Sequence, residues 1–211
     1  MISILVVAVV ISASLHIRAE YFGPRHQVYM FKPLTMVGIL VVAVLGQAAS
    51  PLYKHIVIGG LLFSLAGDVF LMLPSDRFME GLVSFLLAHL FYIAAFSSEI
   101  TGLSWWPMIP MLGCGIVFYV ILAPSLGAMK VPVIFYIVVI LSMAWLAWER
   151  WIGGAASMAF LGAILFVLSD LILALNRFRG EFKSARILNL SAYFAAQLLI
   201  AGSIWFPLGG N

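Results

Sequence analysis

The stretch Gly60–Leu71 reads GLLFSLAGDVFL, and the stretch Gly162–Leu173 reads GAILFVLSDLIL. Each is an apolar run of helical length with one carboxylate, Asp68 or Asp170, directly after a small residue and eight residues after a glycine. A charged side chain at the centre of a membrane-spanning helix costs about 2.5–3.5 kcal/mol on insertion scales and marks a functional site by default. The matching surroundings therefore indicate a shared function. The alternative is that each acid is neutral or hydrogen-bonded inside a helical bundle.

The composition is that of a membrane protein. The 211 residues are 64% hydrophobic and 9% charged, with a mean hydropathy of +1.16, whereas soluble domains carry roughly 25% charged residues. A helix needs about 20 residues to cross about 30 Å of hydrocarbon. Eight runs suit this role: Ile2–Ile17, Pro33–Ala49, Ile56–Leu73, Phe78–Ser97, Trp105–Leu122, Val131–Trp148, Ala155–Leu175 and Ile187–Phe206. We predict an all-α polytopic membrane protein with eight transmembrane helices and a single transmembrane domain over residues 1–211.

Lysine and arginine are distributed unevenly between the predicted connections. The even-numbered connections and the termini carry only Lys54 and Arg150. The odd-numbered connections carry the other nine: Arg18, Arg25, Lys32, Arg77, Lys130, Arg177, Arg179, Lys183 and Arg186. Because basic connections stay in the cytoplasm, we expect both termini to face away from it, in a bacterial inner (plasma) membrane. The net charge of +3 then reflects this bias and anionic headgroups, not nucleic-acid binding.

The first run lacks the basic n-region and the small-residue cleavage site of a signal peptide, so we expect it to be retained.

The two acids lie 102 residues apart, and Lys32 and Pro33 open the second run much as Lys130 and Pro132 open the sixth. Four spans return the chain to its starting side. The sequence therefore predicts two parallel four-helix repeat halves, residues 1–104 and 105–211.

Further polar residues fall where they can meet the two acids. Each acid lies about five residues from the cytoplasmic end of its run, or roughly 7–8 Å deep. Spacings of three or four residues place the polar side chains of the fourth and eighth runs on single helical faces. In hydrocarbon these groups need internal partners, so we predict a polar cavity open to the cytoplasmic side. Its members are Lys32, His89, Tyr92, Tyr136, Asn189, Tyr193 and Gln197.

Each of these residues also has an ordinary role open to it. Tyrosines are enriched near membrane surfaces, and Lys32 can extend its ammonium group toward the interface. His89 can be a core histidine bonded to a backbone carbonyl. The single cysteine, Cys114, lies in an apolar run and is expected to serve packing.

The residue types limit the chemistry that the chain can perform. A zinc hydrolase needs three or four convergent ligands, but His16, His26 and His55 fall at predicted span ends or in loops on different sides, which leaves only His89 beside the acids. No GxSxG nucleophile elbow occurs. We therefore expect no metal and no cofactor. A carboxyl pair with a histidine is equipped for general acid–base work on an acid-labile bond.

Five segments carry a family resemblance. They are YFGPRHQVYMFKPLTM (Tyr21–Met36), GDVFLMLP (Gly67–Pro74), GLVSFLLAHLFYIAAF (Gly81–Phe96), GAILFVLSDLILA (Gly162–Ala174) and YFAAQLLI (Tyr193–Ile200). Together they resemble the YhhN-like family of integral membrane proteins, the lysoplasmalogenases. The most specific element is FKPLT, followed by GD and then by His and Tyr in the next run. The resemblance implies hydrolysis of the vinyl ether bond of lysoplasmalogens, which releases a fatty aldehyde and a glycerophospho-ethanolamine or -choline.

The polar residues fit this reaction. Protonation of the enol-ether carbon yields an oxocarbenium ion, which water traps as a hemiacetal that collapses to aldehyde and alcohol. We expect one of Asp68 and Asp170 to donate the proton and the other to act as base and cation stabiliser, with His89 as the third catalytic residue. The expected substrate-binding residues are Lys32, at the phosphate, with Tyr92, Tyr136, Asn189, Tyr193 and Gln197. The expected partner is a lysophospholipid within the bilayer; the oligomeric state is not specified.

A proton-coupled carrier or binding protein for a lipid or amphiphile is the alternative. Paired intramembrane acids in repeated halves suit such a carrier as well. The third and seventh runs lack the Gly/Pro interruptions typical of unwound carrier helices, and this favours an enzyme. A structural lipid-packing protein would explain the apolar composition but not the acids.

Overall fold

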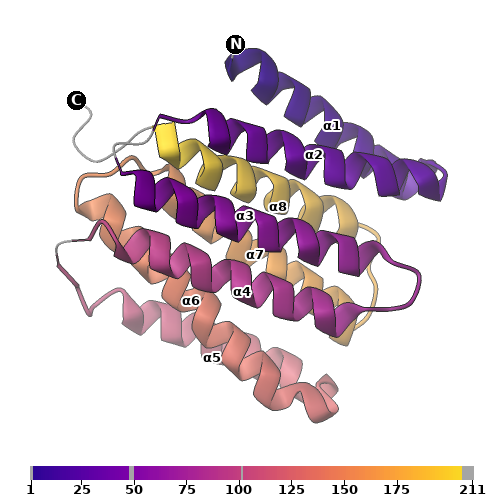
Figure 1. Cartoon of the computed structure of the whole chain (residues 1–211). Coiled ribbons are helices and arrows are strands. Elements are labelled where there is room, and N and C mark those ends of the chain that lie inside the picture. The colour runs from indigo at the N-terminus through magenta and orange to yellow at the C-terminus, as the bar shows by residue number, and fades with distance from the viewer. Residues whose placement is uncertain (1, 48–49, 101, 206–211) are drawn as a thin grey trace.

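The computed structural model describes residues 2–47, 50–100 and 102–205, which form a bundle of helices (Figure 1). Within these residues eight helices are long and apolar enough to cross a membrane, and no strand occurs. Their α-helical parts are α1 (Ile2–Phe22), α2 (Arg25–Leu45), α3 (Pro51–Met72), α4 (Phe78–Ser97), α5 (Met108–Leu122), α6 (Lys130–Ile152), α7 (Met158–Phe178) and α8 (Ala185–Gly202). Short 3-10 turns lengthen three of them, to spans of Met108–Ser125, Gly127–Ile152 and Ala185–Trp205. The predicted all-α fold with eight spans is confirmed. The protein is an integral membrane protein.

The ends of the helices differ from the predicted ends where charged turns extend an apolar run. The Phe78–Ser97 run coincides with α4, but α1 continues to Phe22 and α2 begins at Arg25. The expectation that Lys32 and Pro33 open the second span is therefore wrong, because both lie two turns inside α2. Hydropathy detects the apolar segment and not the helix around it. The predicted end points Ala49 and Phe206 lie outside the described residues.

The two ends of the bundle differ in charge. Helix α1 begins and helix α8 ends at one end of the bundle in Figure 1, and the connections α1–α2, α3–α4, α5–α6 and α7–α8 lie at the other. We call the latter the basic end, because the nine lysines and arginines of the odd-numbered connections lie at or near it. That this end faces the cytoplasm remains a prediction.

Local signals at both ends of α3 fix the position of Asp68. Ser50 caps the helix by accepting a hydrogen bond from the backbone N–H of Tyr53, at 3.2 Å, and Pro51 occupies the first helical position. Ser and Pro are strongly preferred at these two positions. The helix ends at Met72, two residues before Pro74, which disfavours helical backbone in the preceding residue. Asp68 consequently lies in the last turns of α3, near the basic end.

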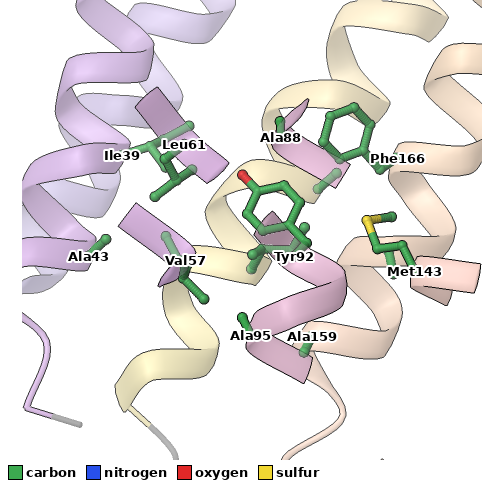
Figure 2. Close-up of a cluster of buried hydrophobic side chains, with 14 of the residues drawn as sticks. Ile39, Ala43, Val57, Leu61, Ala88, Tyr92, Ala95, Met143, Ala159 and Phe166 are labelled. Carbon is green, nitrogen blue, oxygen red and sulfur yellow. The ribbon is translucent and has the colours of Figure 1, made fainter. Parts of the chain in front are cut away.

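The helices that carry the acids pack closely against their sequence neighbours. A Cβ atom added to Gly60 of α3 would overlap the ring of Tyr92 on α4, and one added to Gly162 of α7 would lie 2.9 Å from the backbone oxygen of Ala196 on α8. Small residues allow such close approach of membrane helices. Figure 2 shows Tyr92 in the buried cluster that includes Phe166 of α7. The absence of a side chain at these two glycines thus lets α3 pack closely against α4 and α7 against α8.

Candidate active site

Asp68 is held by side chains from two other helices. Its carboxylate is buried, with 1% of its side chain exposed, and Oδ1 lies 3.0 Å from Nζ of Lys32 on α2. The Tyr193 hydroxyl of α8 donates a hydrogen bond to Oδ2 at 2.6 Å. A buried carboxylate requires such compensation, because an unpaired charge in an apolar interior is costly. Lys32 therefore pairs with Asp68 and does not extend to the interface.

Asp170 has a different pair of neighbours. The Tyr136 hydroxyl of α6 donates a hydrogen bond to Oδ2 at 2.5 Å, and Nε2 of His89 on α4 lies 3.7 Å from the same oxygen. His89 is fully buried, with its ring edge-on to Tyr136 at 5.3 Å between centroids. Within the described residues, Nε2 of His89 makes no hydrogen bond. The histidine therefore faces the Asp170 carboxyl group, but it lines none of the cavities found among the described residues.

Asp68 and Asp170 line the same small cavity. Its volume is about 20 Å³, enough for one water molecule. Asn189 forms part of its wall and donates a hydrogen bond from Nδ2 to the backbone oxygen of Ser169 at 2.8 Å. The cavity, which we call the acid cavity, is lined by Lys32, Asp68, Leu71, Phe85, Ser169, Asp170, Leu173, Asn189, Leu190 and Tyr193.

A wider polar cavity of about 420 Å³, which we call the vestibule, adjoins the acid cavity at the basic end. Lys32 and Asn189 line both. Its rim carries Glu20, Arg25 and Arg186, and the Glu20 carboxylate lies 3.8 Å from Nη1 of Arg186. Glu20 and Arg186 were not predicted as lining residues from the sequence. Glu20 follows the first apolar run and Arg186 precedes the eighth, so the sequence alone places both in connections. A polar route thus leads from the basic end to the two acids.

Two of the predicted site residues lie deeper in the bundle. The hydroxyl of Tyr92 donates a hydrogen bond to Oε1 of Gln197 at 2.7 Å, and both side chains are fully buried. Neither lines the acid cavity, the vestibule or the other cavities found among the described residues. Their contact with substrate remains a prediction, whereas the hydrogen bond between them links α4 to α8.

His16 and Arg150 are placed differently from the sequence interpretation. His16 does not lie at a span end but inside α1, fully buried, with its ring 5.7 Å from that of Phe194. Arg150 is not in a connection, because α6 continues to Ile152. Its side chain is 1% exposed and its Nη2 lies 2.8 Å from Oε2 of Glu99. Hydropathy could not predict that these two side chains are buried, because neighbouring helices bury them.

Among the described residues, no group of three or more His, Cys, Asp or Glu side chains is arranged to hold a metal ion. His89 and the two acids are the titratable groups closest to this requirement, but Lys32 occupies one face of Asp68. The donors present suit proton transfer. The expectation of a metal-independent reaction remains a prediction.

The YhhN family model matches residues 27–204. The chain belongs to the YhhN family. It is 34% identical over 206 residues to "Uncharacterized membrane protein YhhN" of Escherichia coli O157:H7, in a match that covers 94% of this chain and 97% of that protein. It is 35% identical over 153 residues to "Lysoplasmalogenase TMEM86A" of Homo sapiens and 37% identical over 145 residues to "Lysoplasmalogenase TMEM86B" of Mus musculus. No solved structure gives a significant match.

The coverage of these YhhN family matches bears on the site. Each of the two lysoplasmalogenase matches covers 67% of this chain but only 62% or 60% of the relative. The region matched by the family model extends from before Lys32 to beyond Gln197, and so contains every predicted site residue. Glu20 and Arg25, on the rim of the vestibule, lie outside it.

Proposed function

We propose that the protein is an ether hydrolase that cleaves the vinyl ether bond of lysoplasmalogens and releases a fatty aldehyde and a glycerophospho-ethanolamine or -choline. The observation that carries this proposal is the acid cavity, which has two carboxyl groups in its wall and room for one water molecule. The similarity to proteins named lysoplasmalogenases supports the substrate class. The continuous helices α3 and α7 favour an enzyme over a carrier with unwound helices.

The neighbours of the two acids suggest which one donates the proton. Asp68 lies 3.0 Å from an ammonium group, and this Coulombic pairing favours its ionised form. Asp170 is bonded to the phenol of Tyr136, with no lysine or arginine among its ion-pair partners in the described residues. We assign Asp170 as general acid and Asp68 as general base and cation stabiliser. His89 and Tyr136 position the Asp170 carboxyl group.

The protons balance over one catalytic cycle. Asp170 transfers its proton to the enol-ether carbon that does not bear oxygen, and the positive charge develops beside the Asp68 carboxylate. Water attacks the oxygen-bearing carbon and gives a proton to Asp68. The substrate is then a hemiacetal. Asp68 then protonates the departing glycerol oxygen as the carbon–oxygen bond breaks, while Asp170 recovers a proton from the hemiacetal hydroxyl. Positioned acid and base groups contribute about 10²–10⁴-fold each to such reactions.

The vestibule suits the zwitterionic headgroup. Lys32, Arg25 and Arg186 line it and can contact the phosphate, since Lys and Arg form charge-assisted hydrogen bonds with phosphate oxygens. Glu20 supplies a carboxylate for the ammonium group. Lys32 lines both the vestibule and the acid cavity. It therefore links the phosphate position to the reacting bond.

The test is to incubate purified protein in detergent micelles with lysoplasmenylethanolamine and to measure aldehyde release. The saturated alkyl ether of the same headgroup is the matched control, because it has no double bond to protonate. We expect aldehyde from the vinyl ether alone. Absence of aldehyde from monodisperse protein would overturn the proposal, and lipid movement coupled to protons in vesicles, without hydrolysis, would establish the carrier instead.

A further inference from the structure

An apolar groove begins at the acid site and lies between α4, α5, α6 and α7. We call it the inner groove; its volume is about 70 Å³, and among the described residues Asp170 and Tyr136 are the only carboxylic or hydroxylic side chains in its lining. Leu173 lines both the inner groove and the acid cavity. The groove therefore offers a hydrocarbon environment directly beside the proposed proton donor.

A second apolar groove continues from the first. This outer groove, of about 310 Å³, lies between α5 and α6 and includes Met108 and Trp145. Gly115, Ile137 and Leu141 line both grooves and form the junction between them. From Gly115 to Met108 the outer groove follows α5 for about 10 Å, at 1.5 Å per residue. The two grooves thus make one path that passes Asp170: it is lined by Phe178 near the basic end and by Met108 near the opposite end.

We propose that this path holds the alkenyl chain of the substrate and that Gly115 determines how long a chain can be accommodated. The inference rests on the proposed function. Its support is the continuity of the path with the acid site, because Asp170 and Leu173 line both the inner groove and the acid cavity. A lysophospholipid with its headgroup in the vestibule and its vinyl ether at the acids places its single chain in this path. Apolar pockets with a few polar groups at one end are typical of lipid sites.

Gly115 lies at the junction of the two grooves, where its contacts leave no room for a side chain. A Cβ atom added there would lie 2.7 Å from Cδ1 of Leu141 and 3.1 Å from Cγ2 of Ile137. A side chain at this position would therefore close the junction between the grooves. The alternative is that Gly115 only lets α5 pack closely against α6, in which case filling it would affect stability but not the choice of chain.

The first experiment compares Gly115→Leu with Gly113→Leu. Gly113 lies on the same helix with nothing within 4 Å of an added Cβ, so it is the matched control. The measurement is the ratio of kcat/KM for a hexadecenyl substrate to that for an octenyl substrate, which does not depend on the fraction of folded enzyme. We expect Gly115→Leu to lower this ratio about tenfold or more, and Gly113→Leu to leave it unchanged. Equal ratios in the two variants would overturn the proposal.

A rescue variant and a binding measurement complete the test. Gly115→Ala should lower the ratio, and adding Leu141→Ala should restore it, because the second change removes the side chain that the new methyl group meets. Binding of saturated hexadecyl and octyl ether lysophospholipids, followed by calorimetry, needs no hydrolysis. If the protein released no aldehyde but Gly115→Leu still weakened hexadecyl binding alone, the chain path would stand and the proposed function would fail. Hydrolysis with unaltered chain preference would overturn the chain path and leave the proposed function standing.

Discussion

At the level of single residues, the two acids share a cavity but differ in their neighbours. Asp68 faces the ammonium group of Lys32, while Asp170 faces the imidazole of His89. The sequence predicted these groups as one set, because periodicity assigns each to a helical face. It did not predict which partner each acid has. That depends on the rotation and axial position of four helices, which periodicity does not specify.

Replacing Asp68 with Asn should abolish aldehyde release. An amide keeps the shape of the side chain but neither accepts the proton of water nor offsets the positive charge on the substrate. We expect a loss of about 10²–10⁴-fold in kcat. The substitution also leaves Lys32 buried without its ion-pair partner, which costs about 3–5 kcal/mol in such pairs.

The double variant Asp68→Asn/Lys32→Met separates these two effects. It removes the unpaired ammonium group and should recover thermal stability while it stays inactive. Both proteins are compared with wild type at equal monodisperse concentration in detergent. If either retained more than about a tenth of wild-type turnover, Asp68 would not be the general base.

Replacing Asp170 with Asn should be milder than replacing Asp68. Nε2 of His89 lies 3.7 Å from the Asp170 carboxyl oxygen, so we expect the imidazole to provide a second route for the proton when the acid is absent. The double variant Asp170→Asn/His89→Gln removes both donors. Its loss of activation free energy should be much larger than the sum of the losses in the two single variants. Initial rates of aldehyde release from the four proteins form a double-mutant cycle. Strict additivity would show that His89 does not act as the reserve donor.

At the level of helices, the apolar runs predicted the number of spans but not all of their ends. The α4 run agrees with the structure because loops bound it on both sides, whereas α6 continues past Trp148 through Glu149 and Arg150. These two charges are 4% and 1% exposed. Glu149 accepts a hydrogen bond from the indole of Trp145 at 3.1 Å. From sequence alone, charged residues at the end of an apolar run are assigned to a loop, because the buried partners that keep them in the helix are not known.

Replacing Arg150 with Met should destabilise the bundle without changing the chemistry. The guanidinium group bonds Glu99 at 2.8 Å and lies 4.4 Å from the centre of the Tyr53 ring. Loss of one partner of a buried ion pair costs about 3–5 kcal/mol, while replacing both with neutral side chains costs much less. Thermal unfolding in detergent should show a lower Tm for Arg150→Met and a partial recovery in Arg150→Met/Glu99→Gln.

The control for this prediction is turnover per folded molecule. Arg150 lies at the end of the bundle opposite the basic end, away from the acid cavity. Turnover should therefore match wild type in both variants. A specific loss of turnover at unchanged Tm would show that this ion pair is coupled to the active site.

At the level of the whole molecule, the division into two repeated halves remains a proposal, and the contacts between helices are consistent with it. Helix α2 contacts α8, and α6 contacts α4, so the second helix of each half packs on the fourth helix of the other. The neighbours of the acids follow the same rule. Lys32 and Tyr136, and likewise His89 and Tyr193, are each 104 residues apart, while the acids are 102 apart. A parallel repeat related by an axis along the membrane normal would place both acids at one depth.

The orientation of the bundle decides from which leaflet the substrate enters. The basic end carries the vestibule and nine of the eleven lysines and arginines, and such residues are retained in the cytoplasm. A reporter that is active only in the cytoplasm should therefore be silent when fused after Asn211 and active when inserted at Gly180, between α7 and α8. Immunoblots of both fusions control for expression.

The reverse pattern would place the vestibule at the outer surface. Lysophospholipids would then reach the acids from the outer leaflet, and the charge bias would need another cause. With the expected pattern, the acids lie in the last turns of two helices at the cytoplasmic interface. Glycerophospho-ethanolamine would then leave into the cytoplasm through the polar vestibule, while the fatty aldehyde remains in the bilayer beside α5.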